Sequence, residues 1–155
     1  MVAKRKHLSR RDSPARKVLT PVVFYWILAI IALLGLADAT FLTVAHLSGD
    51  DAVCGSSTGC STALGSPYAA IKGIPTAAFG AVAYFTVFSL AVLAAFGYTW
   101  ARGFIVVLVA TMLLASLYFL YLQAFVLHAF CPFCLFSAAM TFLLTGLLVA
   151  VPTPR

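Results

Sequence analysis

Four cysteines are the residues of this 155-residue chain best suited to chemistry. Cys54 and Cys60 are separated by five residues, and Cys131 and Cys134 form the motif Cys-Pro-Phe-Cys. At the start of a helix, backbone N–H groups and the helix dipole stabilise a thiolate, and two sulfurs at this spacing can form a bridge. Pro132 suits the first helical turn, where a missing N–H costs nothing. The motif therefore predicts a redox-active pair at a helix start.

The first pair differs from the second because its surroundings favour movement. The residues between Cys54 and Cys60 are small or polar: Gly55, Ser56, Ser57, Thr58 and Gly59. Disulfide exchange requires a thiolate to attack a sulfur directly, so a pair on a flexible linker can meet a soluble partner and then the fixed pair. Two cysteine pairs of these kinds indicate a redox relay.

Three other uses of the cysteines compete with a relay. Two structural disulfides are the simplest. A four-cysteine zinc site is disfavoured, because a five-residue spacing in a mobile loop is unusual for zinc ligands. Covalent haem attachment needs His after the second cysteine of the motif, and this chain has Leu135 there. We therefore expect no metal, and we keep a non-enzymatic membrane protein with structural disulfides as an alternative.

The elements that position these cysteines must lie in a membrane. The chain is 63% apolar and 9% charged, with a mean hydropathy of +1.07. Too few polar side chains are present to cover a water-soluble globule, and disordered chains have the opposite composition. Membrane β-barrels have short alternating segments, whereas the apolar runs here are long and continuous. The composition predicts an all-α membrane protein.

Four segments are long enough to cross a bilayer as helices, which takes about 20 apolar residues. They are residues 22–47, 76–97, 104–128 and 132–151. We expect a four-transmembrane-helix bundle over residues 21–155, preceded by a basic cytoplasmic tail at residues 1–20. The first segment extends past a possible signal-cleavage site at residues 37–39, so we expect it to be retained as a helix. One long loop, residues 48–75, joins the first two helices.

The basic residues predict the orientation. Seven of the ten Lys and Arg residues precede residue 18. With the N-terminus inside, the cytoplasmic side also holds Arg102 and Arg155, and the other side holds only Lys72. We expect both termini to be cytoplasmic in a cell inner membrane, with the tail facing anionic lipid rather than nucleic acid. All four cysteines then face the extracytoplasmic side, which is oxidising in bacteria.

The order of the motifs resembles the vitamin K epoxide reductase (VKOR) family, and bacterial stand-alone members most closely. The resemblance rests on the cysteines together with Ser-Pro-Tyr at 66–68, Gly-Ile-Pro at 73–75 and Tyr-Phe-Leu-Tyr-Leu at 118–122. The DsbB family places its Cys-x-x-Cys in the first outer loop, which is a different order. The resemblance implies a four-helix bundle around a quinone, either ubiquinone or menaquinone, and a separate thioredoxin-fold (DsbA-like) partner.

The resemblance also implies roles for single residues. Cys54 is the shuttle cysteine that meets the partner, Cys60 relays to Cys131, and Cys134 is the thiolate beside the quinone. Further quinone-site positions are Ser66, Phe79, Thr76 and Ala138. The last two stand where the animal enzymes have Asn and Tyr, which argues against vitamin K epoxide reduction, although that reaction is kept as an alternative.

Helical spacing suggests roles for several further side chains. Tyr118, Tyr121 and Phe125 share one face near the cysteine motif and form a candidate quinone wall, with core packing as the competing interpretation.

On the fourth helix, Ser137, Thr141 and Thr145 follow Cys134 at three- and four-residue steps and should face the bundle interior. Asp38 lies in an apolar span, where a carboxylate is costly; a structural role is favoured. His46 and His128 are interpreted as interfacial polar caps.

The sequence thus predicts a quinone-dependent thiol–disulfide oxidoreductase for disulfide bond formation. It oxidises a secreted thioredoxin-fold protein and passes the electrons through two cysteine pairs to a membrane quinone. Because each step is an exchange equilibrium, the direction depends on reduction potentials.

Overall fold

The computed structural model describes residues 14–49, 55 and 58–151, and the side chains from Pro21 onward. Its long helices are α1 (Pro14–Ser48), α3 (Thr76–Ala95), α4 (Trp100–Tyr121) and α5 (Pro132–Ala150). Each contains a segment long and apolar enough to cross a membrane. The predicted all-α, four-helix membrane fold is therefore confirmed. The boundary between the basic tail and the helical bundle, expected near residue 20, stays a prediction. Helix α1 begins before it, at Pro14.

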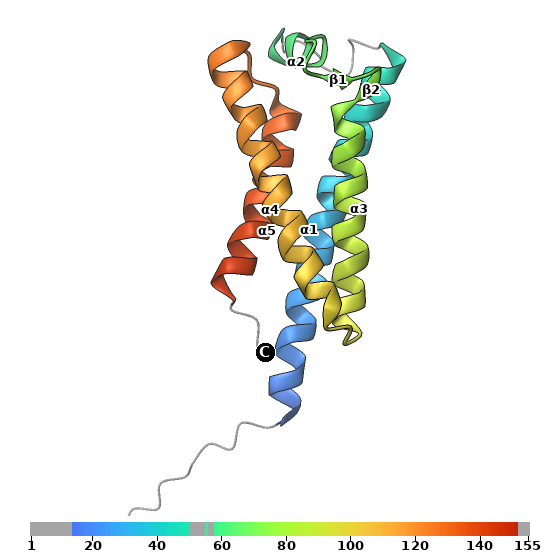
Figure 1. The fold of residues 1–155 in the computed structure, drawn as a ribbon, viewed down its shortest axis with the longest axis vertical. Coiled ribbons are helices and arrows are strands. Elements are labelled where there is room, and N and C mark those ends of the chain that lie inside the picture. The colour runs from blue at the N-terminus through green and yellow to red at the C-terminus, as the bar shows by residue number, and fades with distance from the viewer. Residues whose placement is uncertain (1–13, 50–54, 56–57, 152–155) are drawn as a thin grey trace, which may run out of the picture.

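The four helices pack around a ring in the order α1, α3, α4, α5, and α1 and α3 make the most extensive contact. Figure 1 shows the start of α1 and the end of α5 at one end of the bundle, and the described part of the long loop at the other end, beside the junction of α4 and α5. We call these the terminal end and the loop end. Which end faces the cytoplasm stays a prediction.

The loop end contains structure that hydropathy does not predict. A short helix α2 (Thr58–Leu64) is followed by a two-stranded antiparallel hairpin, β1 (Ala70–Ile71) and β2 (Ile74–Pro75). The hairpin turns through Lys72 and Gly73, both with positive φ, which glycine adopts without strain. These pieces lie across the loop end of the bundle (Figure 1). Thr58 and Gly59, which we expected in a flexible linker, are instead the first residues of α2.

The end of α4 departs from regular α-helix. A single π-helical turn, η2 (Leu122–Val126), replaces the α-helical spacing. Such turns insert one extra residue and change which side chains face inward, and they occur often at functional sites. The turn leaves Gln123 buried and ends in a tight connection to α5, in which His128 has a positive φ. This geometry sets the position of the Cys-Pro-Phe-Cys motif.

Candidate functional site

The motif cysteines occupy the first turn of α5, as predicted. Cys131 is the N-cap residue and Pro132 begins the helix. The ring of Phe133 packs on Phe41 of α1, with centroids 5.3 Å apart, which holds this turn against the bundle. Cys131 and Cys134 are free thiols. The motif is therefore fixed in place with both sulfurs reduced.

Gln123 is a positioning residue that sequence reasoning did not identify. Its side-chain Oε1 accepts a hydrogen bond from the Cys131 N–H at 3.0 Å, and its backbone carbonyl accepts one from Ala129 at 3.1 Å. The residue thus fixes the α4–α5 connection through both side chain and backbone. A glutamine within an apolar span was the available signal, because a polar group at that depth requires a partner.

The loop cysteine Cys60 lies against the motif. Cys60 and Cys131 are fully buried in one cluster, with Cys134, Ala63 and Phe133 packed around them. Cys60 is disulfide-bonded, and Cys54 lies outside the described residues. The structure therefore brings three of the four predicted catalytic cysteines together at the loop end.

A glycine makes this approach possible. A Cβ built on Gly59 would lie 2.3 Å from the carbonyl oxygen of Phe130, closer than any side chain can pack. The backbone of α2 therefore rests directly on the segment that precedes Cys131. Since Cys60 follows Gly59 in α2, the close backbone contact sets the position of the loop cysteine beside the motif.

The pKa of the Cys131 thiol is lowered from its usual 9.0 to about 7. The main cause is a hydrogen bond from the Cys134 thiol, and the amides of Phe133 and Cys134 at the helix start act in the same direction against the effect of burial. No side-chain hydrogen bond caps α5, so the amides act on the sulfur through their partial charges. The hydrogen bond and the helix-start amides thus both favour a thiolate at Cys131 in this redox state.

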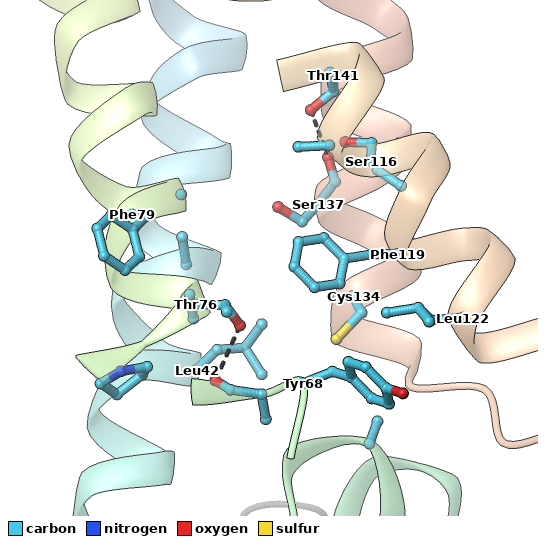
Figure 2. Close-up of a pocket in the computed structure, with 18 of the residues that line it drawn as sticks. Leu42, Tyr68, Thr76, Phe79, Ser116, Phe119, Leu122, Cys134, Ser137 and Thr141 are labelled. Carbon is cyan, nitrogen blue, oxygen red and sulfur yellow. Dashed lines mark hydrogen bonds between the residues drawn. The ribbon is translucent and has the colours of Figure 1, made fainter. Parts of the chain in front are cut away.

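An apolar cavity of about 350 Å³ opens beside Cys134. Its walls come from α1, α3, α4, α5 and the loop. Figure 2 shows Cys134, Tyr68, Phe119 and Leu122 gathered at one end, with Thr76 and Phe79 on the opposite wall. The volume lies within the range of small-molecule sites, which combine apolar walls with a few polar groups. A cavity of this kind fits an aromatic ring carrying an apolar tail.

Tyr84 spans the bundle deeper in the cavity and links α3 to α5. Its hydroxyl donates to the Ser137 carbonyl at 2.6 Å and lies 2.9 Å from Thr141 Oγ1. The ring fits against α1 because residue 35 is glycine; a Cβ there would lie 2.4 Å from the ring. The predicted polar face of α5 thus points inward through Ser137 and Thr141, both on the cavity wall.

The predicted quinone-site residues divide into two groups. Five of them line the cavity together: Cys134, Ser66, Thr76, Phe79 and Ala138. The three residues predicted as a quinone wall do not: Tyr118 and Tyr121 of α4 and Phe125 of η2 are 53%, 57% and 68% exposed and lie outside the lining. The aromatic side chain that α4 contributes is Phe119, the neighbour of Tyr118 (Figure 2).

Three polar residues singled out in the sequence, two histidines and one aspartate, differ in their relation to the cavity. His46, interpreted as an interfacial cap, lines the cavity, whereas His128 is exposed and does not. Asp38 does not line the cavity; its Oδ2 is buried and has no hydrogen-bond partner. Among the residues described, no group of three or more His, Cys, Asp or Glu could hold a metal ion.

Paired thiols beside an apolar cavity, held by four membrane-length helices, define a membrane protein built for thiol–disulfide chemistry. Residues 26–149 match the model of the vitamin K epoxide reductase family, so this chain belongs to that family. Its members are membrane oxidoreductases that in general use quinones and thioredoxin-like partners. The resemblance predicted from the cysteine order is confirmed.

Proposed function

We propose that this protein oxidises the dithiol of a secreted thioredoxin-fold protein, transfers the electrons through two cysteine pairs, and reduces a membrane quinone. The proposal rests on the arrangement of three cysteines. Cys60 packs on Cys131, and Cys134, one helical turn further on, lines the cavity. The three residues form a continuous series from the loop to the cavity.

The first exchange takes place with the partner. A partner thiolate attacks Cys54 of a Cys54–Cys60 disulfide, and Cys60 leaves as a thiolate. The second partner thiol then attacks the mixed disulfide and displaces Cys54. The partner has lost two electrons and forms its own disulfide, and Cys54 and Cys60 are reduced.

The second exchange moves both electrons inward. The Cys60 thiolate attacks Cys131 of a Cys131–Cys134 disulfide and displaces Cys134. Cys54 then attacks Cys60, and Cys131 leaves as a thiolate. A leaving thiol with a low pKa departs faster, and the pKa of about 7 at Cys131 favours this step. The product has Cys60 in a disulfide and two free motif thiols, which is the redox state of the described structure.

The last step transfers the two electrons of the motif thiols into the cavity. A bound quinone would supply an acceptor for two electrons and two protons. The Cys131 thiolate closes the S–S bond to Cys134 as the electron pair leaves through Cys134. Phe119, Tyr68 and Phe79 would hold the ring and exclude water, and the apolar remainder of the cavity suits the tail.

The proposed location follows from the charge distribution. With the basic tail in the cytoplasm, the loop end and its cysteines face the extracytoplasmic side of a bacterial inner membrane, where the secreted partner is available. A respiratory quinone in that membrane draws the relay toward oxidation of the partner.

The test is to reconstitute the purified protein in membranes with quinone and a reduced DsbA-like protein. We expect one quinol for each partner disulfide formed. Vitamin K epoxide in place of quinone should give no turnover, because Ala138 offers no hydroxyl and Thr76 donates its own to the Ala69 carbonyl at 3.0 Å. Absence of both partner oxidation and quinol formation would contradict the proposal.

A further inference from the structure

One ionisable side chain on the cavity wall has no part in the cysteine relay. The face of α1 that lines the cavity consists of Ala39, Leu42 and His46, spaced three and four residues apart. Ala39 and Leu42 are buried and His46 is half-buried. The imidazole is therefore part of the cavity wall.

His46 lies at the same end of the cavity as the reactive thiol. It is in the last turn of α1, two residues before Ser48, and Cys134 is the third residue of α5. Helices α1 and α5 pack against each other, and both residues are at the loop end.

The proposed reaction needs proton transfer at this place. When Cys131 and Cys134 form a disulfide, two thiol protons are released; when a quinone becomes a quinol, its two oxygens take up two protons. A transfer group must be able both to donate and to accept near neutral pH, and histidine is the side chain that does so.

Two hydroxyl groups on the cavity wall near the motif, those of Ser66 and Thr76, are already committed. Ser66 donates to the Ala63 carbonyl at 2.8 Å, and Thr76 donates to the Ala69 carbonyl at 3.0 Å. Deeper in the cavity, Tyr84 donates to a carbonyl of α5. Within the described part of the chain, by contrast, the His46 imidazole has no hydrogen-bond partner.

We infer that His46 is the proton-transfer residue of the quinone site, an inference that rests on the proposed function. As the Cys131–Cys134 bond forms, the imidazolium donates a proton to one quinone oxygen, is reprotonated by water at the loop end, and donates a second proton to the other oxygen. The two protons that the thiols release replace the two taken from this water. Over a full turn, two thiols and a quinone become one disulfide and one quinol, and His46 returns unchanged.

None of the other ionisable groups on the cavity wall is a histidine, the side chain that both donates and accepts a proton near neutral pH. Tyr68 from the loop, Tyr84 from α3 and Cys134 from α5 share the cavity. On α1, Asp38 lies two turns inward, off the lining face, and Lys72 in the hairpin is also outside the lining. Asp50 and Asp51, which follow α1 in the sequence, lie outside the described residues.

The test compares His46→Gln with His128→Asn, a matched change at an exposed histidine away from the cavity; asparagine tolerates the positive φ at residue 128. For His46→Gln we expect kcat for quinol formation to fall about 100-fold, with KM for quinone unchanged. The reduced Cys131–Cys134 pair should accumulate after one round of partner oxidation, as alkylation and gel shift would detect. The wild-type rate should fall at alkaline pH, and this fall should be absent in His46→Gln. His128→Asn should match the wild type in each readout.

A second variant separates proton transfer from folding. In His46→Ala, added imidazole should restore part of the rate, whereas a structural defect would not respond. A His46→Gln enzyme with unchanged rate and pH profile, or with raised KM and unchanged kcat, would overturn the inference and leave the proposed function intact. Failure of the wild type to reduce quinone would overturn both.

Discussion

The terminal half and the loop half of the bundle use similar apolar residues for opposite purposes. In the terminal half, side chains from all four long helices meet in a continuous core, which includes Leu28, Ala32, Val87, Ala91, Ile105 and Leu144. In the loop half the same helices enclose a cavity instead of filling the space. Tyr84 marks the boundary, because it belongs to the core and also lines the cavity.

The difference shows how one small bundle can be closely packed in one half and hollow in the other. Small residues such as Ala32 and Ala91 let the helices approach closely at the terminal half, as is common in membrane bundles. The loop half, by contrast, is held together at its rim by contacts of the loop and of the α4–α5 connection. The close contact of Gly59 with Phe130 is one of these, and the hydrogen bond from Cys131 to Gln123 is another. The candidate site therefore lies in the half where specific contacts replace continuous packing.

Adding a side chain at the rim of the hollow half should have the largest effect. Gly59→Val places carbon where the Phe130 carbonyl now lies and should push α2, with Cys60, away from Cys131. Displacement of reacting atoms by about 1 Å can cost about 100-fold in rate, and we expect a loss of that size in electron transfer from loop to motif. Stopped-flow measurement of partner oxidation would detect it.

The matched control for this variant is Gly146→Ala in α5, where an added Cβ meets nothing within 4 Å. It should leave the rate unchanged. Equal rates for Gly59→Val and wild type would show that α2 does not set the distance between the cysteine pairs.

Adding a side chain at the boundary should affect stability more than rate. Gly35→Ala directs a methyl group into the ring of Tyr84, at 2.4 Å from its nearest atom. Overpacking of a core costs about 1–3 kcal/mol, so thermal unfolding in detergent should begin at a lower temperature than for the wild type. Gly103→Ala, with open space around the new Cβ, is the control. A Gly35→Ala protein as stable as wild type would mean that this contact is not tight.

The smallest expected effect is a shift in the titration of Cys131. With the motif reduced, its thiolate should form with a midpoint near pH 7 rather than near the usual 9.0, because the Cys134 thiol donates a hydrogen bond to it. Cys134→Ala removes that donor, so the midpoint should move to higher pH. Ultraviolet absorbance of the thiolate measures both midpoints, and a midpoint that stays near 7 without Cys134 would assign the shift to the helix start instead.

Features that depend on the mean hydropathy of a segment or on a short motif could be predicted from the sequence. The four helices follow from hydropathy, and the cysteine pair at a helix start follows from Cys-Pro-Phe-Cys. The inward face of α4 could not be predicted in the same way, because lipid is as apolar as the bundle interior and both faces of the helix are apolar. Tyr118 and Phe119 are neighbours in sequence, yet only Phe119 lines the cavity.

The loop was also beyond prediction, for a different reason. A helix as short as α2 is not stable alone, and its residues pack against the segment before Cys131, which is 71 residues further along the chain than Cys60. The π-helical turn at residues 122–126 likewise follows from the connection it makes and not from local preference. Both features serve to position the motif.

The central claim, that the two cysteine pairs act in series through Cys60 and Cys131, has one direct test. In the double variant Cys54→Ala, Cys134→Ala, only these two cysteines remain, and their side chains already share one buried cluster. Mild oxidation should join them in an intramolecular disulfide in nearly every molecule, detectable by mass spectrometry after proteolysis. A folded double variant that keeps both thiols free, or that links only between molecules, would contradict the relay.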